Sequence, residues 1–198
     1  MQGIFFVKTL SSNMKKPSQL VYLLLFVVMG CHTKQQRVPE NNLHIASAFV
    51  DAFYSFNRDS LQAVLSSAEA SQPEILYYQK WAECGHYEVL QRHTPFEKND
   101  STVIFPVTVK DDLMAALQID FNVTDTFHIA IRDGKIRSVQ TSSNDPDEYY
   151  EAKEWVKEHH PEFIEIPCEG IWEGGPTPCE CIQGMLKGFR ALKAQENQ

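Results

Sequence analysis

One carboxyl group in the sequence stands out because it lies among apolar side chains in a segment of alternating character. Alternate positions of residues 119–132 hold Phe121, Val123, Asp125, Phe127, Ile129 and Ile131. These side chains share one face of a β-strand, so Asp125 is expected to be buried. An unpaired buried carboxylate is costly, and Asp125 must therefore be hydrogen-bonded, protonated or directed into a cavity. It is either a candidate general base or a structural residue bonded to a backbone amide, a Tyr or a Trp.

A second group of candidate residues is aromatic. Between Ile75 and Gly85 the chain carries Tyr77, Tyr78 and Trp81, which combine large apolar rings with hydroxyl and indole donors. These side chains are candidates for ligand binding at the mouth of a pocket. The alternative is that they belong to the hydrophobic core.

Histidine and metal chemistry receive less support. His86 and His93 have opposite parity in one expected strand, so at most one of them faces inward. His159, His160 and Glu162 could bind a metal, but histidines are also favoured at a helix C-terminus by its dipole. The sequence has no serine-nucleophile, zinc-protease, phosphate-loop or dinucleotide-binding motif. We therefore expect neither a metal site nor a cofactor.

Residues 1–30 have the layout of a secretory signal. They contain Lys8, Lys15 and Lys16, no acidic residue, and an apolar run over 20–29. That run is too short to cross a bilayer, which takes about 20 apolar residues. Met14 is a more natural start for such a signal than Met1, so the true start codon is left open.

The end of this segment resembles the bacterial lipobox. Val28, Met29, Gly30 and Cys31 reproduce its order of an apolar residue, a middle residue, a small residue and Cys. The resemblance implies cleavage before Cys31 and lipidation of that residue, and several acyl chains give stable membrane anchoring. No acidic residue directly follows Cys31, which in lipoproteins favours the periplasmic face of the outer membrane.

Composition and charge exclude several protein classes. The chain has 198 residues, 43% hydrophobic and 22% charged, which is typical of a globular protein rather than a disordered or polytopic membrane protein. Its net charge of −8 excludes a basic nucleic-acid surface. Without residues 1–30 the chain would be more acidic still. Residues 31–42 then read as the lipid anchor followed by a polar tether.

Four cysteines follow the expected anchor residue, and an envelope location permits disulfides. Cys179 and Cys181 are too close in sequence to pair easily. A bond between Cys168 and Cys181 would close a loop rich in Gly and Pro, which leaves Cys84 to pair with Cys179. A zinc site is the rival interpretation, but no C-x-x-C spacing supports it.

The periodicity of the rest of the chain predicts helices followed by strands. A first amphipathic helix over 43–56 carries apolar residues at helical spacing, and a short second helix is expected with Asp59 as its cap. Residues 75–85 are expected to form a third short helix or a loop at the pocket wall. Strands are expected at 86–97, 102–110, 119–132 and 135–143, with a hairpin turn at Asp133-Gly134. This order indicates an α+β fold.

A helical extension is expected after the last strand, over residues 146–198. Asp145 precedes Pro146 and two acidic residues, which is a helix-start pattern. A second helix is expected to begin near Thr177 and to pack back on the domain through its apolar face. The cysteine pairs would staple this extension to the rest of the protein.

The segments around the first helix and the last hairpin resemble a known superfamily. Ala48–Phe53, Phe121–Ile129 and Asp133–Ile136 are similar to the SnoaL-like branch of the nuclear transport factor 2-like superfamily. The resemblance covers about residues 43–145. It implies a cone, in which a curved antiparallel sheet wraps round the N-terminal helices and encloses a pocket.

Two functions follow as expectations. The first is an envelope lipoprotein whose domain binds a small apolar ligand or a protein partner. The second, implied by the resemblance to SnoaL-like enzymes, is a cofactor-free isomerase, cyclase or dehydratase with Asp125 as its general base. The family also often forms homodimers through the outer face of the sheet, so self-assembly is a third, weaker expectation.

Overall fold

The structure, a computed structural model, describes residues 41–170 and 178–197, and its first element is helix α2 (Asn42–Tyr54). Asn41 caps this helix, because its side chain accepts a hydrogen bond from the backbone N–H of Leu43. The apolar face predicted from the helical spacing is buried. It includes Ile45, Ala46, Phe49, Val50 and Phe53.

Two further helices, α3 (Arg58–Val64) and α4 (Gln72–Cys84), follow α2. The side chain of Asn57 caps α3 by accepting from the N–H of Ser60, so the expectation that Asp59 is the cap is wrong. The helix begins two residues earlier than expected, and Asp59 lies in its first turn.

A buried glutamine on α4 fastens this helix to the end of α2. The side-chain amide of Gln79 donates to the carbonyl oxygens of Ala52 and Phe53, at 3.0 and 2.9 Å. These carbonyls belong to the last turn of α2, where no intrahelical donor is available. The contact orients α4 beside α2 and sets the position of the aromatic residues on α4.

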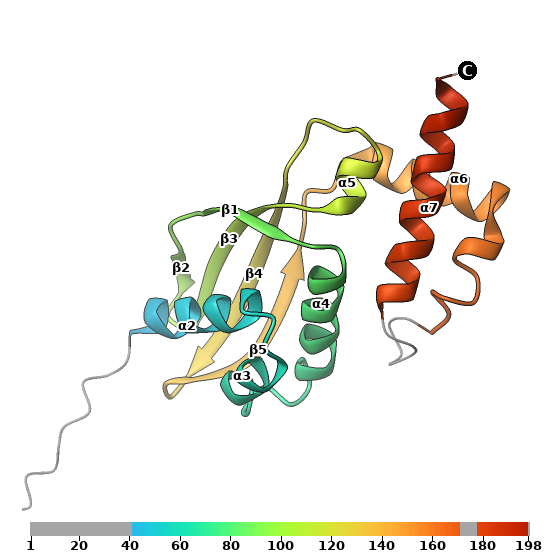
Figure 1. The fold of residues 1–198 in the computed structure, drawn as a ribbon. Coiled ribbons are helices and arrows are strands. Elements are labelled where there is room, and N and C mark those ends of the chain that lie inside the picture. Colours follow the sequence, from blue (N-terminus) through green and yellow to red (C-terminus); the bar gives the residue numbers. More distant parts are fainter. Residues whose placement is uncertain (1–40, 171–177, 198) are drawn as a thin grey trace, which may run out of the picture. The chain divides into compact units, whose positions relative to one another are not determined.

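The helices pack on a curved antiparallel sheet (Figure 1). Its strands are β1 (Glu88–Arg92), β2 (Phe96–Asn99), β3 (Thr102–Lys110), β4 (Val123–Arg132) and β5 (Lys135–Ser142). The strand order is β1-β3-β4-β5, and β2 also pairs with β3. The single strand expected over 86–97 is therefore two short strands. Pro95 lies between them and has no N–H to donate to a ladder.

The hairpin between β4 and β5 has the geometry that its sequence indicates. Asp133 and Gly134 both have positive φ, at 55° and 68°, as a two-residue turn of the primed type requires. Arg132 and Lys135 pair directly across the turn. The register shifts by one residue between Ala130 and Ile131, and alternate residues of β4 lie on the inner face of the sheet.

A short helix interrupts the connection from β3 to β4. Helix α5 (Asp112–Ala116) is capped by Asp111, whose Oδ1 accepts from the N–H groups of Leu113 and Met114 at 2.8 and 3.0 Å. This helix accounts for the break in the strand pattern between residues 110 and 119. Asp111 is 4% exposed, so its cap lies inside the domain.

The C-terminal part contains α6 (Asp147–His159), the 3-10 turn η2 (Pro161–Phe163) and α7 (Pro178–Glu196). Asp145 does not cap α6, contrary to the expectation. Its Oδ2 accepts hydrogen bonds from the hydroxyls of Ser143 and Tyr150 at 2.5 and 3.2 Å. Pro146 occupies the cap position and fixes an extended backbone there instead.

One disulfide joins the C-terminal part to α4, and a second lies within the C-terminal part. Cys84 on α4 is bonded to Cys179 on α7, and Cys168 is bonded to Cys181. These are the two pairs that the cysteine spacing predicted. Disulfides persist in oxidising surroundings, so the bonds indicate a non-cytoplasmic compartment.

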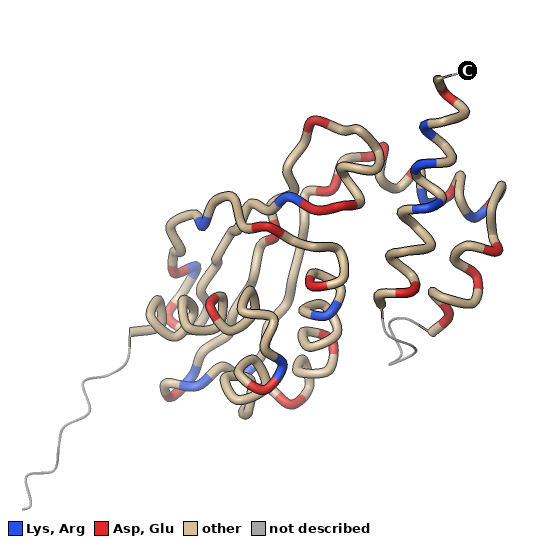
Figure 2. Tube along the Cα trace, viewed as in Figure 1, with Lys and Arg blue, Asp and Glu red and all other residues tan. Residues whose placement is uncertain are grey.

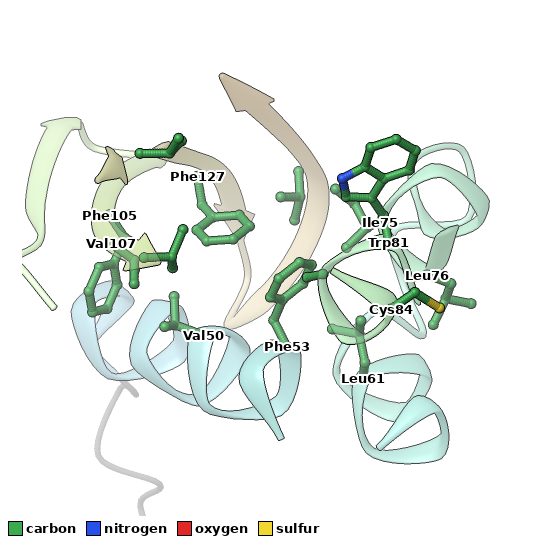
Figure 3. Packing of buried hydrophobic residues seen from close by; sticks show 14 of the residues in the cluster. Val50, Phe53, Leu61, Ile75, Leu76, Trp81, Cys84, Phe105, Val107 and Phe127 are labelled. Carbon is green, nitrogen blue, oxygen red and sulfur yellow. The ribbon is translucent and has the colours of Figure 1, made fainter. Parts of the chain in front are cut away.

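The core lies between α2, α4 and the concave face of the sheet. Figure 3 shows Val50 and Phe53 of α2 directed toward Val107 and Phe127 of the sheet. The ring of Phe127 packs against both Phe49 and Phe53, with centroids 5.3 and 5.0 Å apart. The described residues thus form an α+β domain in which one face of a five-stranded sheet is covered by helices.

The N-terminal expectations lie outside the described residues. These are the signal segment 1–30, the lipidated Cys31 and most of the tether 31–42. Within 41–170 and 178–197, no helix is both long and apolar enough to span a membrane.

Candidate functional site

Asp125 lies in the middle of β4, on the inner face of the sheet, and is 1% exposed. The alternation in β4 therefore places it inside the domain, as the sequence predicted. Two tyrosines approach it from different helices. The hydroxyl of Tyr54, in the last turn of α2, donates to Oδ2 at 3.2 Å, and Tyr78 on α4 adds a second hydroxyl interaction.

The two carboxyl oxygens of Asp125 differ in their hydrogen bonding. Oδ1 is buried and has no hydrogen-bond partner in the part of the chain that the structure describes. Nearly all buried polar atoms in proteins are hydrogen-bonded, because desolvation without a partner is unfavourable. An exception of this kind at a cavity wall marks a position that an incoming donor would fill.

Burial raises the pKa of Asp125 to about 6. The hydrogen bonds from Tyr78 and Tyr54 oppose this shift because they stabilise the carboxylate, while Asp145 and Asp111 add to it by repulsion. At neutral pH the group is mostly ionised, and it gains a proton within the range that an acid–base catalyst uses. The phenols beside it stay protonated, because burial raises the pKa of Tyr54 and Tyr78 above the usual value.

Asp125 forms part of the wall of a cavity of about 290 Å³, which we call the Asp125 cavity. Its wall comes from α4, α5, β4, β5, α6 and the segments next to them. The acidic residues in the wall are Glu74, Asp111, Asp125 and Asp145. The aromatic residues are Tyr78, Trp81, Tyr87, Tyr149 and Tyr150, and Lys153 is the basic one. Figure 2 shows acidic residues at the start of α5 and at the start of α6, two elements at this wall.

Two of the three aromatic residues expected at a pocket line this one. Tyr78 and Trp81 lie in the wall together with Asp125. Tyr77 is half-buried on the same helix, and burial raises its pKa to about 12. It is not one of the described residues in this wall, because it lies one position before Tyr78 and points about 100° away round the helix.

Lys153 reaches the cavity from α6 and faces aromatic rings. Its ammonium lies 5.4 Å from the ring centre of Tyr149 and 5.8 Å from that of Tyr150. Burial and the neighbouring Lys157 lower its pKa, and Glu154 and Asp145 oppose this. Lys153 makes no ion pair within 4.0 Å to any carboxylate of the described chain.

The histidines lie elsewhere. His86 is exposed and its Nδ1 lies 2.6 Å from Oδ2 of Asp112, outside the cavity wall. On the outer face of the sheet, His93 is hydrogen-bonded to the hydroxyl of Thr108, which is also hydrogen-bonded to the hydroxyl of Thr124. Neither histidine approaches Asp125.

The residues that the sequence offered as metal ligands form ordinary contacts within the protein. His160 bonds Glu162, and His159 bonds the carbonyl of Trp155. Within residues 41–170 and 178–197, no three His, Cys, Asp or Glu side chains are grouped as metal ligands would be.

A second cavity of about 230 Å³ lies under the C-terminal helices. Its wall is almost wholly apolar and includes Trp81, Val156, Ile164, Met185 and the Cys168–Cys181 disulfide. Lys153 and Lys157 complete this wall, which contains no carboxylate among the described residues.

Several residues of the Asp125 cavity could not be found from the sequence. Tyr87 lies in a segment predicted as a strand, and Tyr54, which hydrogen-bonds Asp125 without lining the cavity, lies in the predicted first helix. Tyr149, Tyr150 and Lys153 belong to the extension, for which the sequence does not distinguish between covering the pocket and forming a docking surface. Their only signal is the density of Tyr in the segments on either side of the predicted strands.

Comparison of the chain with family models, with curated proteins and with solved structures finds no match. The functional conclusion therefore rests on the residues of the cavity. Their arrangement offers a buried carboxylate with one open oxygen, neutral phenols beside it, and aromatic walls of a size that suits a small molecule.

Proposed function

We propose that this protein is an envelope lipoprotein whose domain binds a small, largely apolar molecule in the Asp125 cavity. The observation that carries the proposal is the buried Oδ1 of Asp125, which lacks a partner among the described residues at a cavity wall. A ligand donor would satisfy this oxygen, while the rings of Tyr78, Trp81 and Tyr149 would cover the apolar part of the ligand.

The proposal includes the fold family. Residues 43–145 would form a nuclear transport factor 2-like cone, closed on one side by the helices of the extension 146–198. The position of α2 and α4 on the concave face of the sheet supports this, as does the polar group at the centre of that face. The extension would then act as part of the pocket wall, since α6 contributes Tyr149, Tyr150 and Lys153.

The proposal also includes the anchor. Lipidation of Cys31 would hold the domain at the membrane surface, facing the periplasm from the outer membrane. The two disulfides support an oxidising compartment, and the lipobox resemblance supports the attachment. Replacing Cys31 by Ala should move the protein from the membrane fraction to the soluble fraction of lysed cells. Membrane retention of the variant would contradict the anchor.

The binding proposal is tested with the full chain, purified in mild detergent with its disulfides intact. Native mass spectrometry should detect a co-purifying small molecule, and thermal shift should find stabilisers among apolar carbonyl compounds, sterols and lipids. Thr141→Phe would fill the cavity and should abolish both signals. Gln140→Phe is the matched control, because Gln140 lies on the opposite face of β5 and is exposed.

The outcomes separate the proposals. Equal ligand binding by both variants would place the ligand elsewhere and contradict binding in the cavity. Absence of any ligand, together with a specific protein captured from envelope extracts by the full chain, would favour a protein partner instead. Light scattering of the same sample distinguishes a homodimer from these cases.

A cofactor-free enzyme is the second candidate, and the pKa of Asp125 favours it. A carboxylate with a pKa of about 6 can remove a proton from carbon next to a ligand carbonyl, and the neutral phenol of Tyr78 can donate to the enolate oxygen. An enzyme of this kind would exchange that ligand proton for deuterium in heavy water. Asp125→Asn should stop the exchange, whereas a ligand-binding protein would bind without exchange.

A further inference from the structure

We propose that the ligand of the Asp125 cavity is a small organic cation that carries N–H donors, such as a protonated amine or an amidine. This inference rests on the proposed ligand binding and specifies its chemistry. It is drawn from three features of the wall: the charges, the unpartnered carboxylate oxygen and the presence of aromatic rings.

The charges in the wall are unbalanced. Four carboxyl groups face one ammonium, that of Lys153. Two of the four are already engaged inside the fold. Asp111 caps α5, and Oδ2 of Asp145 accepts from Ser143 and Tyr150. An anionic ligand would meet repulsion from this wall, whereas a cation would relieve the repulsion between Asp125, Asp111 and Asp145.

The open oxygen defines what the ligand must present. Oδ1 of Asp125 is buried and lacks a partner among the described residues, while Oδ2 is held by Tyr54. A carboxylate oxygen can only accept, so the complementary ligand atom must be a donor. Charge-assisted hydrogen bonds between N–H and carboxylate are stronger than neutral ones, particularly away from water. An N–H cation satisfies both demands with one group.

The aromatic side chains complete the argument. Cations are attracted to the faces of Tyr and Trp rings. Lys153 demonstrates this in the wall itself, since its ammonium lies over the rings of Tyr149 and Tyr150. A ligand ammonium between Asp125 and the rings of Tyr78, Tyr87 and Trp81 would be in a similar environment, with an acceptor that Lys153 lacks.

The volume of the cavity restricts the ligand further. At about 290 Å³ it lies at the lower end of the range for ligand sites. We therefore choose a single-ring amine as the probe. Phenethylamine, phenethyl alcohol and hydrocinnamate share a ring and a short arm and differ mainly in charge, so they test the head group at nearly constant shape.

The experiment is calorimetric titration of the three probes into the full chain at neutral pH. The amine should bind at least tenfold more tightly than the alcohol, and the carboxylate should not bind. Asp125→Asn should weaken binding of the amine by about ten- to a hundredfold, the range expected for loss of a hydrogen bond to a charged group. Asp100→Asn is the charge-matched control, because Asp100 is exposed in the turn between β2 and β3. It should leave amine binding unchanged.

A second variant keeps the inference testable if Asp125→Asn does not fold. Lys153→Gln removes the cation that competes in the wall, so it should strengthen amine binding severalfold and leave the alcohol unchanged. Lys157→Gln, on the exposed side of α6, should leave the binding of both the amine and the alcohol unchanged.

Two results would contradict the proposal that the ligand is a cation. One is an alcohol or carboxylate that binds as tightly as the amine and depends on Asp125. The other is no amine binding in wild type and in Lys153→Gln. In either case, loss of the co-purified molecule from the Thr141→Phe variant would still support ligand binding in the cavity. Failure of the cation proposal is therefore distinguishable from failure of the proposed function.

Discussion

The hydroxyl of Tyr54 donates a hydrogen bond to Oδ2 of Asp125 across 3.2 Å and so joins the last turn of α2 to the middle of β4. The two residues are 71 positions apart in the sequence. The bond engages Oδ2 and leaves the buried Oδ1 without a hydrogen-bond partner among the described residues. It connects the packing of the helix on the sheet with the chemistry of the site.

Removing this bond should raise the pKa of Asp125 above about 6. Tyr54→Phe keeps the ring in the core but deletes the hydroxyl that stabilises the carboxylate, so protonation becomes easier. Titration of the carboxyl carbon by nuclear magnetic resonance measures the change. Tyr150→Phe is the control, because it deletes a similar bond to Asp145 and leaves the partner of Asp125 in place. A lowered or unchanged pKa of Asp125 in Tyr54→Phe would contradict this role.

The stability of the protein should depend on pH through Asp125. Its pKa is raised from 3.8 to about 6 on folding, so between these values the folded protein holds a proton that the unfolded chain releases. Wild type therefore loses stability as pH rises through this window, and the contribution is fully present only below about pH 4. Asp125→Asn does not titrate. Its free energy of unfolding relative to wild type should rise from pH 4 to pH 7, by at most roughly 3 kcal/mol.

Urea unfolding at several pH values from 4 to 7 measures this difference. Asp100→Asn, at an exposed position, provides the comparison and should follow wild type across the range. A difference between Asp125→Asn and wild type that stays constant with pH would show that the carboxyl group does not change its pKa on folding.

The two disulfides should differ in their contribution to stability. Cys84 and Cys179 are 95 positions apart, whereas Cys168 and Cys181 are 13 apart. Loop-closure entropy then predicts a loss of about 4–5 kcal/mol for the Cys84/Cys179 double Ala variant and about 3 kcal/mol for the other pair. Urea unfolding of each double variant measures the losses. A greater loss from the shorter loop would contradict the entropic explanation.

Close packing of α7 against η2 depends on Gly184. A Cβ at this position would lie 1.9 Å from the carbonyl oxygen of Phe163, which belongs to the backbone and cannot rotate away. Gly184→Ala should therefore destabilise the protein by about 1–3 kcal/mol through overpacking. Thermal unfolding measures this. Gln183→Ala, exposed on the same helix, should have little effect, and equal stability of the two variants would be inconsistent with the contact.

Features with a local physical cause were predictable from the sequence. Alternation in β4 placed Asp125 inside, because successive side chains of a strand point to opposite faces. Asp133 and Gly134 indicated the hairpin because both tolerate positive φ. The spacing of Cys179 and Cys181 excluded their pairing and led to the two bonds that the structure contains.

Choices between equivalent local signals were less certain. Asn57 and Asp59 are both good helix caps, and the start of α3 is decided by how the chain leaves α2. The strand expected over 86–97 breaks because both of its halves pair with β3, while Pro95 between them cannot donate. Such differences of one or two residues reflect packing that a local pattern does not contain.

The sequence by itself determined that a carboxyl group lies on the apolar face of a strand and that the cysteines can staple a helical extension. Only the tertiary structure decided which groups surround that carboxyl. Tyr54 from α2 hydrogen-bonds the carboxyl group, and Tyr78 from α4 and Lys153 from α6 line the cavity, because their helices pack on neighbouring parts of the domain. Periodicity reports the face on which a side chain lies, whereas its neighbours depend on contacts between segments far apart in the chain.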